Sequence, residues 1–225
     1  MAIVGLVPAA GYATRLAGSI DGSKEVQIVR GRPVMRYVVD RMRAGGATSI
    51  RIVTRRDKRD VIDLAVEIGA DVTLGRPTTV SASLILASRG LADRDIGLFG
   101  FPDTVWTPAD GFVPLVRLVD EGEPLALGLF DSPYPERSDV AILDDEGRLL
   151  RVEIKPSRPS GSLVWAAGAV RIGTLRTILR DVEPGDAFNA MAQRVPIAAV
   201  RLGRVIDIGT PPSLLEASDD PVFAP

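Results

Sequence analysis

A loop of small residues with two cations near the start of the chain offers the clearest chemistry. Residues 8–16 read PAAGYATRL, directly after the apolar run 2–7, and Lys24 follows them. Small residues let backbone N–H groups approach phosphate oxygens closely. The Arg15 guanidinium of this loop suits bidentate contact with phosphate, and the Lys24 ammonium adds a point charge. The pattern therefore predicts one end of a nucleotide site, with a tight turn as the structural alternative.

Two carboxylates occur where apolar runs end. Asp103 follows the run 96–101, and Asp207 lies between two isoleucines shortly before the segment GTPPS. Ligands of open α/β sheets bind beside the carboxyl ends of strands, where carboxylate and phosphate oxygens can hold Mg²⁺. We therefore interpret Asp103 as a metal ligand or as an Asp that starts a turn. Asp207 is either a second ligand or a helix-capping or ion-paired residue.

The segment VEIKPS at 152–157 contains candidates for binding a phosphorylated sugar. The period of a strand puts Glu153 and Lys155 on one face and Ile154 on the other. Because a residue before proline avoids the helical region, we expect Lys155 to be extended. Its ammonium could bind a sugar phosphate and Glu153 could bind sugar hydroxyls, whereas a solvated lysine is the simpler alternative.

Other polar and aromatic residues have simpler interpretations. In the run 163–171, we interpret Trp165 as core packing in preference to a sugar platform, and Gly168 as a point of close approach. The remaining charge clusters are predicted to be solvated: Glu136 and Arg137, and the group Arg55, Arg56, Lys58 and Arg59.

Composition limits the chemistry further. The 225-residue chain has a net charge of −2 and neither His nor Cys. Imidazole bases, thiolate nucleophiles, disulfides and zinc sites with His or Cys ligands are therefore excluded for it. Without a basic excess, nucleic acid is not an expected partner. No apolar run approaches the ~18 residues of a membrane-spanning helix and no signal-like segment is found, so we expect a cytoplasmic protein with no membrane partner.

Apolar runs and helical patterns alternate through the first half of the chain, which predicts βαβ units and a mostly parallel sheet. The second half predicts shorter, antiparallel strands. The expected strands are 2–7, 50–54, 96–101, 125–130, 139–143, 149–154, 163–172, 197–202 and 205–208, and the expected helices are 33–44, 61–68, 81–89, 112–119, 175–179, 187–193 and 213–217. We expect one α/β domain over residues 1–225.

Taken in order, these motifs resemble the sugar-1-phosphate nucleotidyltransferases, which make nucleotide sugars, and in particular a short bacterial glucose-1-phosphate thymidylyltransferase-like branch. The resemblance covers residues 2–217 and rests on PAAGYATRL with Lys24, PDTVW, VEIKP, WAAGAV and VIDIGTPPSLLEA. It implies a Rossmann-like three-layer α/β/α fold with a mixed, mostly parallel central sheet and a small antiparallel sugar-binding subregion. Residues 1–120 would form the nucleotide-binding half, 121–218 the sugar-phosphate-binding half, and 219–225 a tail.

The resemblance also implies a role for each matching residue. Arg15 would bind the departing pyrophosphate, and Lys24 would stabilise the α-phosphate in the transition state; these are the catalytic candidates. Asp103 and Asp207 would hold Mg²⁺. The nucleotide would contact Pro8, Ala9, Ala10, Gly11, Thr14, Arg15 and Gly75, with backbone amides of residues 9–11 on its phosphates. Lys155 would bind the sugar 1-phosphate, with Glu153 and Gly168 on the sugar.

The chain departs from the family pattern in several places. Ala13 replaces the usual second Gly of the loop, Ile154 stands where a Glu is common before Lys-Pro, and Asp103 follows Phe-Pro rather than Gly. The loop at 75–79 also differs, so contacts to the base stay open.

Two alternatives remain at this point: a cytidylyltransferase acting on a non-sugar alcohol phosphate, and a non-catalytic nucleotide-sugar-binding protein. The resemblance favours dTTP or UTP with a sugar 1-phosphate as small-molecule substrates. A homo-oligomer stays open.

Overall fold

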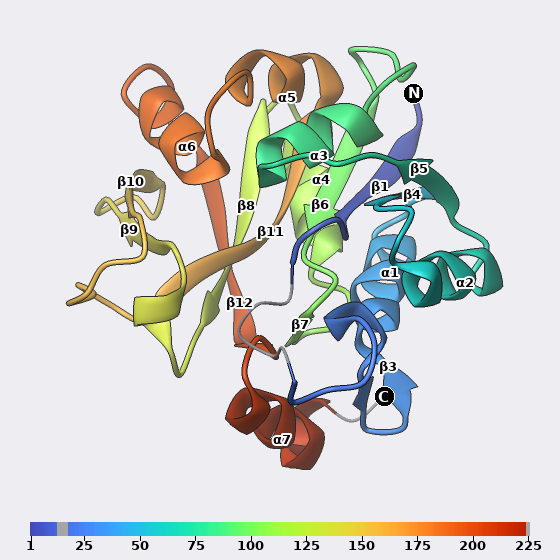
Figure 1. Ribbon diagram of the computed structural model, residues 1–225. Coiled ribbons are helices and arrows are strands. Elements are labelled where there is room, and N and C mark those ends of the chain that lie inside the picture. The colour runs from blue at the N-terminus through green and yellow to red at the C-terminus, as the bar shows by residue number, and fades with distance from the viewer. Residues whose placement is uncertain (13–17, 224–225) are drawn as a thin grey trace.

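Parallel strands of apolar residues form one half of the central sheet. The computed structural model describes residues 1–12 and 18–223. Four strands, β5 (Asp71–Leu74), β4 (Ser49–Thr54), β1 (Ile3–Pro8) and β6 (Ile96–Gly100), pair in parallel in that order. Their carboxyl ends meet at one edge of the sheet, where the residues that follow β1 and β6 come close together (Figure 1).

Antiparallel pairing appears where the chain enters its second half. The strand β11 (Leu163–Arg171) pairs antiparallel with both β6 and β8 (Leu125–Asp131). The strand β12 (Ala198–Asp207) runs parallel to β8, and its end pairs antiparallel with β7 (Thr104–Trp106). A hairpin of β9 (Val140–Leu143) and β10 (Leu149–Glu153) joins β11 through β9, and β2 (Ile28–Val29) and β3 (Arg32–Pro33) pair separately.

Helices cover both faces of this sheet. On one face lie α1 (Val34–Ala44), α2 (Arg59–Glu67) and α4 (Phe112–Asp120); on the other lie α3 (Val80–Ala87), α5 (Ile172–Ile178) and α6 (Pro184–Ala192). The helix α7 (Pro211–Asp219) packs beyond the end of β12. The expected three-layer mixed α/β fold is confirmed. None of the helices in the described part of the chain is long and apolar enough to cross a membrane.

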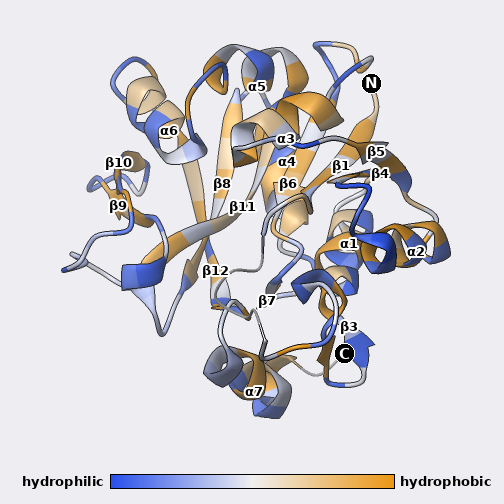
Figure 2. Cartoon of the chain, viewed as in Figure 1, coloured by the Kyte–Doolittle hydropathy of each residue, from blue (hydrophilic) through white to orange (hydrophobic). Residues whose placement is uncertain are grey.

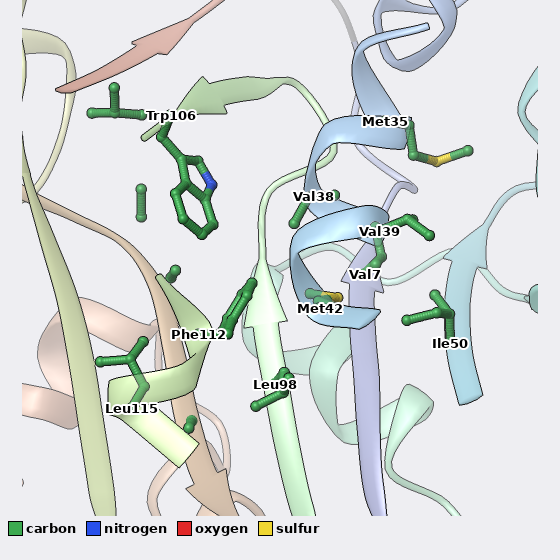
Figure 3. Packing of buried hydrophobic residues seen from close by; sticks show 14 of the residues in the cluster. Val7, Met35, Val38, Val39, Met42, Ile50, Leu98, Trp106, Phe112 and Leu115 are labelled. Carbon is green, nitrogen blue, oxygen red and sulfur yellow. The ribbon is translucent and has the colours of Figure 1, made fainter. Parts of the chain in front are cut away.

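The amphipathic patterns of α1, α2 and α4 explain this layering on one face of the sheet, whereas α3 is apolar nearly all round. Apolar residues gather on the strands and on the helix faces turned towards them, and polar residues face outwards (Figure 2). In Figure 3, Val38 and Met42 of α1 lie over Val7 of β1 and Leu98 of β6, and all four side chains are fully buried. Burying one such side chain stabilises a fold by about 1.5–3 kcal/mol, so this contact fixes α1 and the loop after β1 relative to the sheet.

The predicted strands and helices are found within a few residues of their expected bounds, but β12 differs from the prediction and β5, β7 and the two-residue strands β2 and β3 were not predicted. Segments 197–202 and 205–208 are one strand, β12, because Gly203 lets the backbone pass against Thr107, where the pairing register shifts. The strand β5 was not predicted because none of its residues is fully buried, so it lacks a buried apolar run. The short β7 was not predicted because it follows β6 after only three residues.

Candidate active site

A cavity of about 450 Å³ opens at the carboxyl ends of β1 and β6. Its walls come from both halves of the chain: the loop after β1, the start of α3, the residues after β6, the ends of β10 and β12, and the start of α7. Figure 1 shows these elements arranged around the centre of the molecule, with β9 and β10 opposite α1 and α2. The volume is typical of small-molecule sites.

Lys24, Asp103 and Asp207 lie together in this cavity. Antiparallel pairing of β7 and β12 places Asp207 opposite Thr104, and the N–H of Ile208 donates to the carbonyl of Asp103 at 3.0 Å. The Lys24 ammonium forms an ion pair and hydrogen bond with Asp103. Asp207 accepts a hydrogen bond from the N–H of Gly209 at 2.6 Å. The two predicted carboxylates therefore lie close together, Asp103 directly before β7 and Asp207 at the end of β12, with the predicted lysine against Asp103.

The charges around Lys24 keep it protonated. Burial alone would lower the pKa of Lys24, but its ion pair and hydrogen bond with Asp103 raise it, as do the charges of Glu25 and Asp207. The net effect is a pKa raised above the ordinary value for lysine. Lys24 therefore supplies a permanent positive charge at neutral pH, and a phosphate entering the cavity would compete with Asp103 for it.

The donor set around Asp103 fits a magnesium ion. The described residues contain no group of three or more His, Cys, Asp and Glu side chains that could hold a metal. Mg²⁺ needs no such cage, because it is usually bound by one or two carboxylates together with substrate phosphates and water. Asp103 and Asp207 would hold the ion, on the same wall of the cavity as Lys24.

The loop after β1 presents only part of the predicted nucleotide site. Pro8 and Gly11 line the cavity, whereas Ala9 and Ala10 are buried behind it. The N–H of Ala9 donates to the carbonyl of Val53 at 2.8 Å, which corrects the expectation that this amide faces a nucleotide. Thr14 and Arg15, like Ala13, lie outside the described residues.

Gly75 is another predicted nucleotide contact that is not found in the cavity wall. A Cβ at this position would lie 2.7 Å from a methyl carbon of Leu86, so its small size is explained by packing under α3. The neighbouring Thr78 and Thr79 line the cavity instead, and Thr79 caps the start of α3. Contacts to the nucleotide from this loop would therefore come from the residues after Gly75.

The charge cluster at 55–59 is not solvated throughout, which corrects the sequence interpretation. Lys58 is 6% exposed and pairs with the fully buried Glu25, with 2.6 Å between Nζ and Oε1. Its ammonium also donates to the carbonyls of Ala9, at 3.1 Å, and Gly11, at 3.3 Å. Lys58 therefore holds the loop after β1 from behind. Arg55 is also buried and lies over the ring of Tyr12, 3.6 Å from its centre.

Removing Lys58 should destabilise the fold strongly. In Lys58→Met, Glu25 stays buried without its cation, and the loss of one partner of a buried ion pair typically costs 3–5 kcal/mol. We expect a loss of about 3–5 kcal/mol in the free energy of unfolding, measured with urea. Lys58→Met combined with Glu25→Gln should regain part of this loss. Equal stability of Lys58→Met and the wild type would contradict the buried pair.

The sugar-side candidates separate into two groups. Lys155 lines the cavity, but its φ of +39° is left-handed and not extended, because the strand ends at Glu153 and the chain turns there. This turn breaks the alternation, so Glu153 does not share a face with Lys155. The Glu153 carboxylate instead accepts hydrogen bonds from Ser160 and Arg151 outside the cavity wall, and Ile154 lines the cavity in its place.

Gly168 is buried in the core and does not line the cavity. A Cβ at this position would overlap the ring of Phe99, which corrects its interpretation as a sugar contact. We therefore expect Gly168→Ala to lower the free energy of unfolding by about 1–3 kcal/mol, as overpacking usually does. Gly161→Ala, in open space on the surface, is the matched control and should change little. Unchanged stability in a urea titration of Gly168→Ala would refute the packing role.

Several cavity residues were not predicted from the sequence. Arg137, interpreted as solvated, lines the cavity with its guanidinium over the ring of Tyr134 and 3.5 Å from the hydroxyl of Thr210. Its place after the carboxyl end of β8 was a usable signal. Asp139 and Glu25 also line the cavity, and nothing in their local sequence distinguishes them from surface acids.

Curated relatives of the chain are nucleotidyltransferases. It is 26% identical over 194 residues to glucose-1-phosphate thymidylyltransferase of Streptomyces antibioticus, which covers 80% of this chain and 52% of the relative. It is 23% identical over 215 residues to the low-salt glycan biosynthesis nucleotidyltransferase Agl11 of Haloferax volcanii. This match covers 88% of this chain and 59% of the relative. The chain thus spans about half the length of the curated relatives it matches. A comparison with models of protein families found no match.

Solved structures share the fold over nearly the whole chain. A structure described as a glucose-1-phosphate thymidylyltransferase from Bacillus anthracis in complex with sucrose has a TM-score of 0.85 at 21% identity, covering 99% of this chain and 95% of that one. A UDP-glucose pyrophosphorylase complexed with UDP-glucose has a TM-score of 0.79 at 18% identity, covering 97% and 98%. At these identities the comparison establishes the fold.

Proposed function

We propose that the chain is a sugar-1-phosphate nucleotidyltransferase, like the curated relatives it resembles, and that it transfers a nucleotidyl group from a nucleoside triphosphate to a sugar 1-phosphate and releases pyrophosphate. The observation that carries this proposal is the meeting of Lys24, Asp103 and Asp207 in one cavity that also reaches Lys155. The two substrates are both anions and would otherwise repel each other. Lys24, Lys155 and a Mg²⁺ ion held by Asp103 and Asp207 would neutralise this repulsion.

The reaction is an in-line substitution at phosphorus. An oxygen of the sugar phosphate attacks the α-phosphorus of the triphosphate, and the bond from that phosphorus to the pyrophosphate oxygen breaks. The attacking oxygen is already ionised, so no general base is needed. Lys155 binds the sugar phosphate, and Lys24 neutralises the charge that grows on the α-phosphate. Asp103 and Asp207 would hold a Mg²⁺ ion, which when bound supplies further charge neutralisation.

The nucleotide is assigned to the wall formed by residues 1–120 and the sugar to the wall formed by 121–218. Gly11 and Thr79 lie on the first wall, and Lys155 and Trp165 on the second. The names of the matched proteins support a hexose 1-phosphate such as glucose 1-phosphate, with dTTP or UTP as the donor. The same names favour a sugar phosphate over an alcohol phosphate, and an enzyme over a binding protein.

A substrate matrix tests this proposal. Each nucleoside triphosphate is combined with each of several hexose 1-phosphates, choline phosphate and methylerythritol phosphate, and pyrophosphate release is measured with and without a chelator of divalent ions. We expect release with at least one hexose 1-phosphate, lost on chelation and restored by Mg²⁺. Release with an alcohol phosphate alone, or no release from any pair, would contradict the proposed function.

A further inference from the structure

Two buried polar atoms on the sugar side of the cavity have no hydrogen-bond partner. Asp139 Oδ1 and Trp165 Nε1 are both shielded from solvent, and neither makes a hydrogen bond of normal geometry within the described part of the chain. Both residues line the cavity, and Trp165 is only 6% exposed. Leaving such groups unpaired costs about 1–3 kcal/mol each, so an unmet pair in a cavity wall is typical of a site that a ligand completes.

The two groups face each other with complementary chemistry. The indole N–H can only donate, whereas the carboxylate can only accept when ionised. The indole N–H lies close enough to the Asp139 carboxylate to lower its pKa, although the two groups do not form a hydrogen bond of normal geometry. Burial raises the pKa of Asp139, but the nearby Lys155 ammonium, the backbone N–H of Lys155 and the indole oppose this. A hydroxyl group both accepts and donates, so one hydroxyl would satisfy both residues together.

Asp139 also lies beside Ile154, where neither Ile154 nor Glu153 presents a carboxylate to the cavity. A Cβ at Gly185 would lie 2.9 Å from Asp139 Oδ2 and 3.3 Å from Ile154 Cγ1, so these two side chains are neighbours. Ile154 lines the cavity but offers no polar atom, and the Glu153 carboxylate is turned away to Ser160. Asp139 therefore supplies a carboxylate beside Lys155 on this wall of the described cavity, which Glu183 at the start of α6 also lines.

We propose that Asp139 and Trp165 bind one hydroxyl group of the sugar ring between them and so determine which sugar 1-phosphate is accepted. This inference rests on the proposed function and adds to it the residues that select the sugar. Trp165 has a second role in packing, because its ring contacts Phe99, Phe101 and Phe188. Trp165→Phe removes the N–H and keeps an aromatic ring, so it separates binding from packing.

The experiment compares a hexose 1-phosphate with its four monodeoxy analogues, each lacking one hydroxyl at carbon 2, 3, 4 or 6. We expect the wild type to lose about 10–100-fold in kcat/KM with one analogue in particular, the size of one hydrogen bond to a charged group. Asp139→Ala and Trp165→Phe should accept that analogue and the parent sugar equally well. Both should raise the KM for the parent sugar phosphate and leave the KM for the nucleotide unchanged.

A matched control and the contrary outcomes complete the test. Asp63→Asn removes an exposed negative charge from α2, on the other side of the sheet and outside the cavity wall, and should behave as the wild type. If both variants lose activity equally with the parent and every analogue, the role is structural and the proposal is overturned. If the wild type turns over no sugar phosphate at all, the proposed function fails and this inference fails with it.

Discussion

Lys24→Met should lower kcat by about 10²–10³-fold. Removing one donor that stabilises charge in a transition state typically costs about 3–4 kcal/mol. Lys24 lies on the same cavity wall as Asp103 and Asp207, and the charges around it raise its pKa, so it carries a positive charge when a phosphate enters the cavity. The measurement is the rate of pyrophosphate release at saturating substrates.

Two controls make this result specific. Lys24→Met also leaves Asp103 without its cation, so the melting temperature of the variant must be compared with that of the wild type. Lys24→Arg keeps the charge and should retain more activity than Lys24→Met. Near-normal turnover by a folded Lys24→Met variant with excess Mg²⁺ would refute the role of Lys24 in the reaction.

Asp103→Asn should have an effect of similar or larger size, about 10³-fold in kcat/KM at a limiting Mg²⁺ concentration. Asp103 is 6% exposed, lies in the turn just after β6, and its carboxylate would bind the ion directly. A bound metal ion supplies several kcal/mol of charge stabilisation, which this variant would lose. The measurement is the dependence of activity on Mg²⁺ concentration, which should shift to much higher values.

The second carboxylate provides the matched comparison. Asp207→Asn should shift the Mg²⁺ dependence in the same direction, and the double variant should be little worse than either single one, because both residues act through one ion. Asp110→Asn, an exposed acid outside the cavity wall, should leave the Mg²⁺ dependence unchanged. Additive losses in the double variant would mean that the two carboxylates act independently.

The meeting of Asp103 and Asp207 was expected from the resemblance to sugar-1-phosphate nucleotidyltransferases, which assigns both residues to one Mg²⁺ ion. For Asp103 the sequence also offered a physical reason, because ligands of α/β sheets bind beside the carboxyl ends of strands. The structure adds the reason for their closeness, which is the pairing of β7 with β12. Since β7 was not predicted, the sequence alone could not place Asp207 opposite Thr104.

Other parts of the site depended on contacts that no local pattern contains. Lys58 lies in a run of charges typical of a surface, and its burial follows from Glu25, 33 residues earlier in the chain. Period-2 alternation failed for Glu153 because the strand ends there and Lys155 turns into the left-handed region. A glycine within a predicted strand indicates that something approaches the backbone closely, and for Gly168 this was taken to be the sugar. The sequence does not show that the close neighbour is the ring of Phe99.

The most direct measurement is the binding of Mn²⁺, as a spectroscopic substitute for Mg²⁺, in the presence of a non-hydrolysable nucleoside triphosphate. If Asp103 and Asp207 hold one divalent ion together, the wild type should bind one Mn²⁺ tightly. Asp103→Asn and Asp207→Asn should then each lose much of this affinity. Wild-type affinity in either variant would show that its carboxylate does not contact the ion, and would contradict the account.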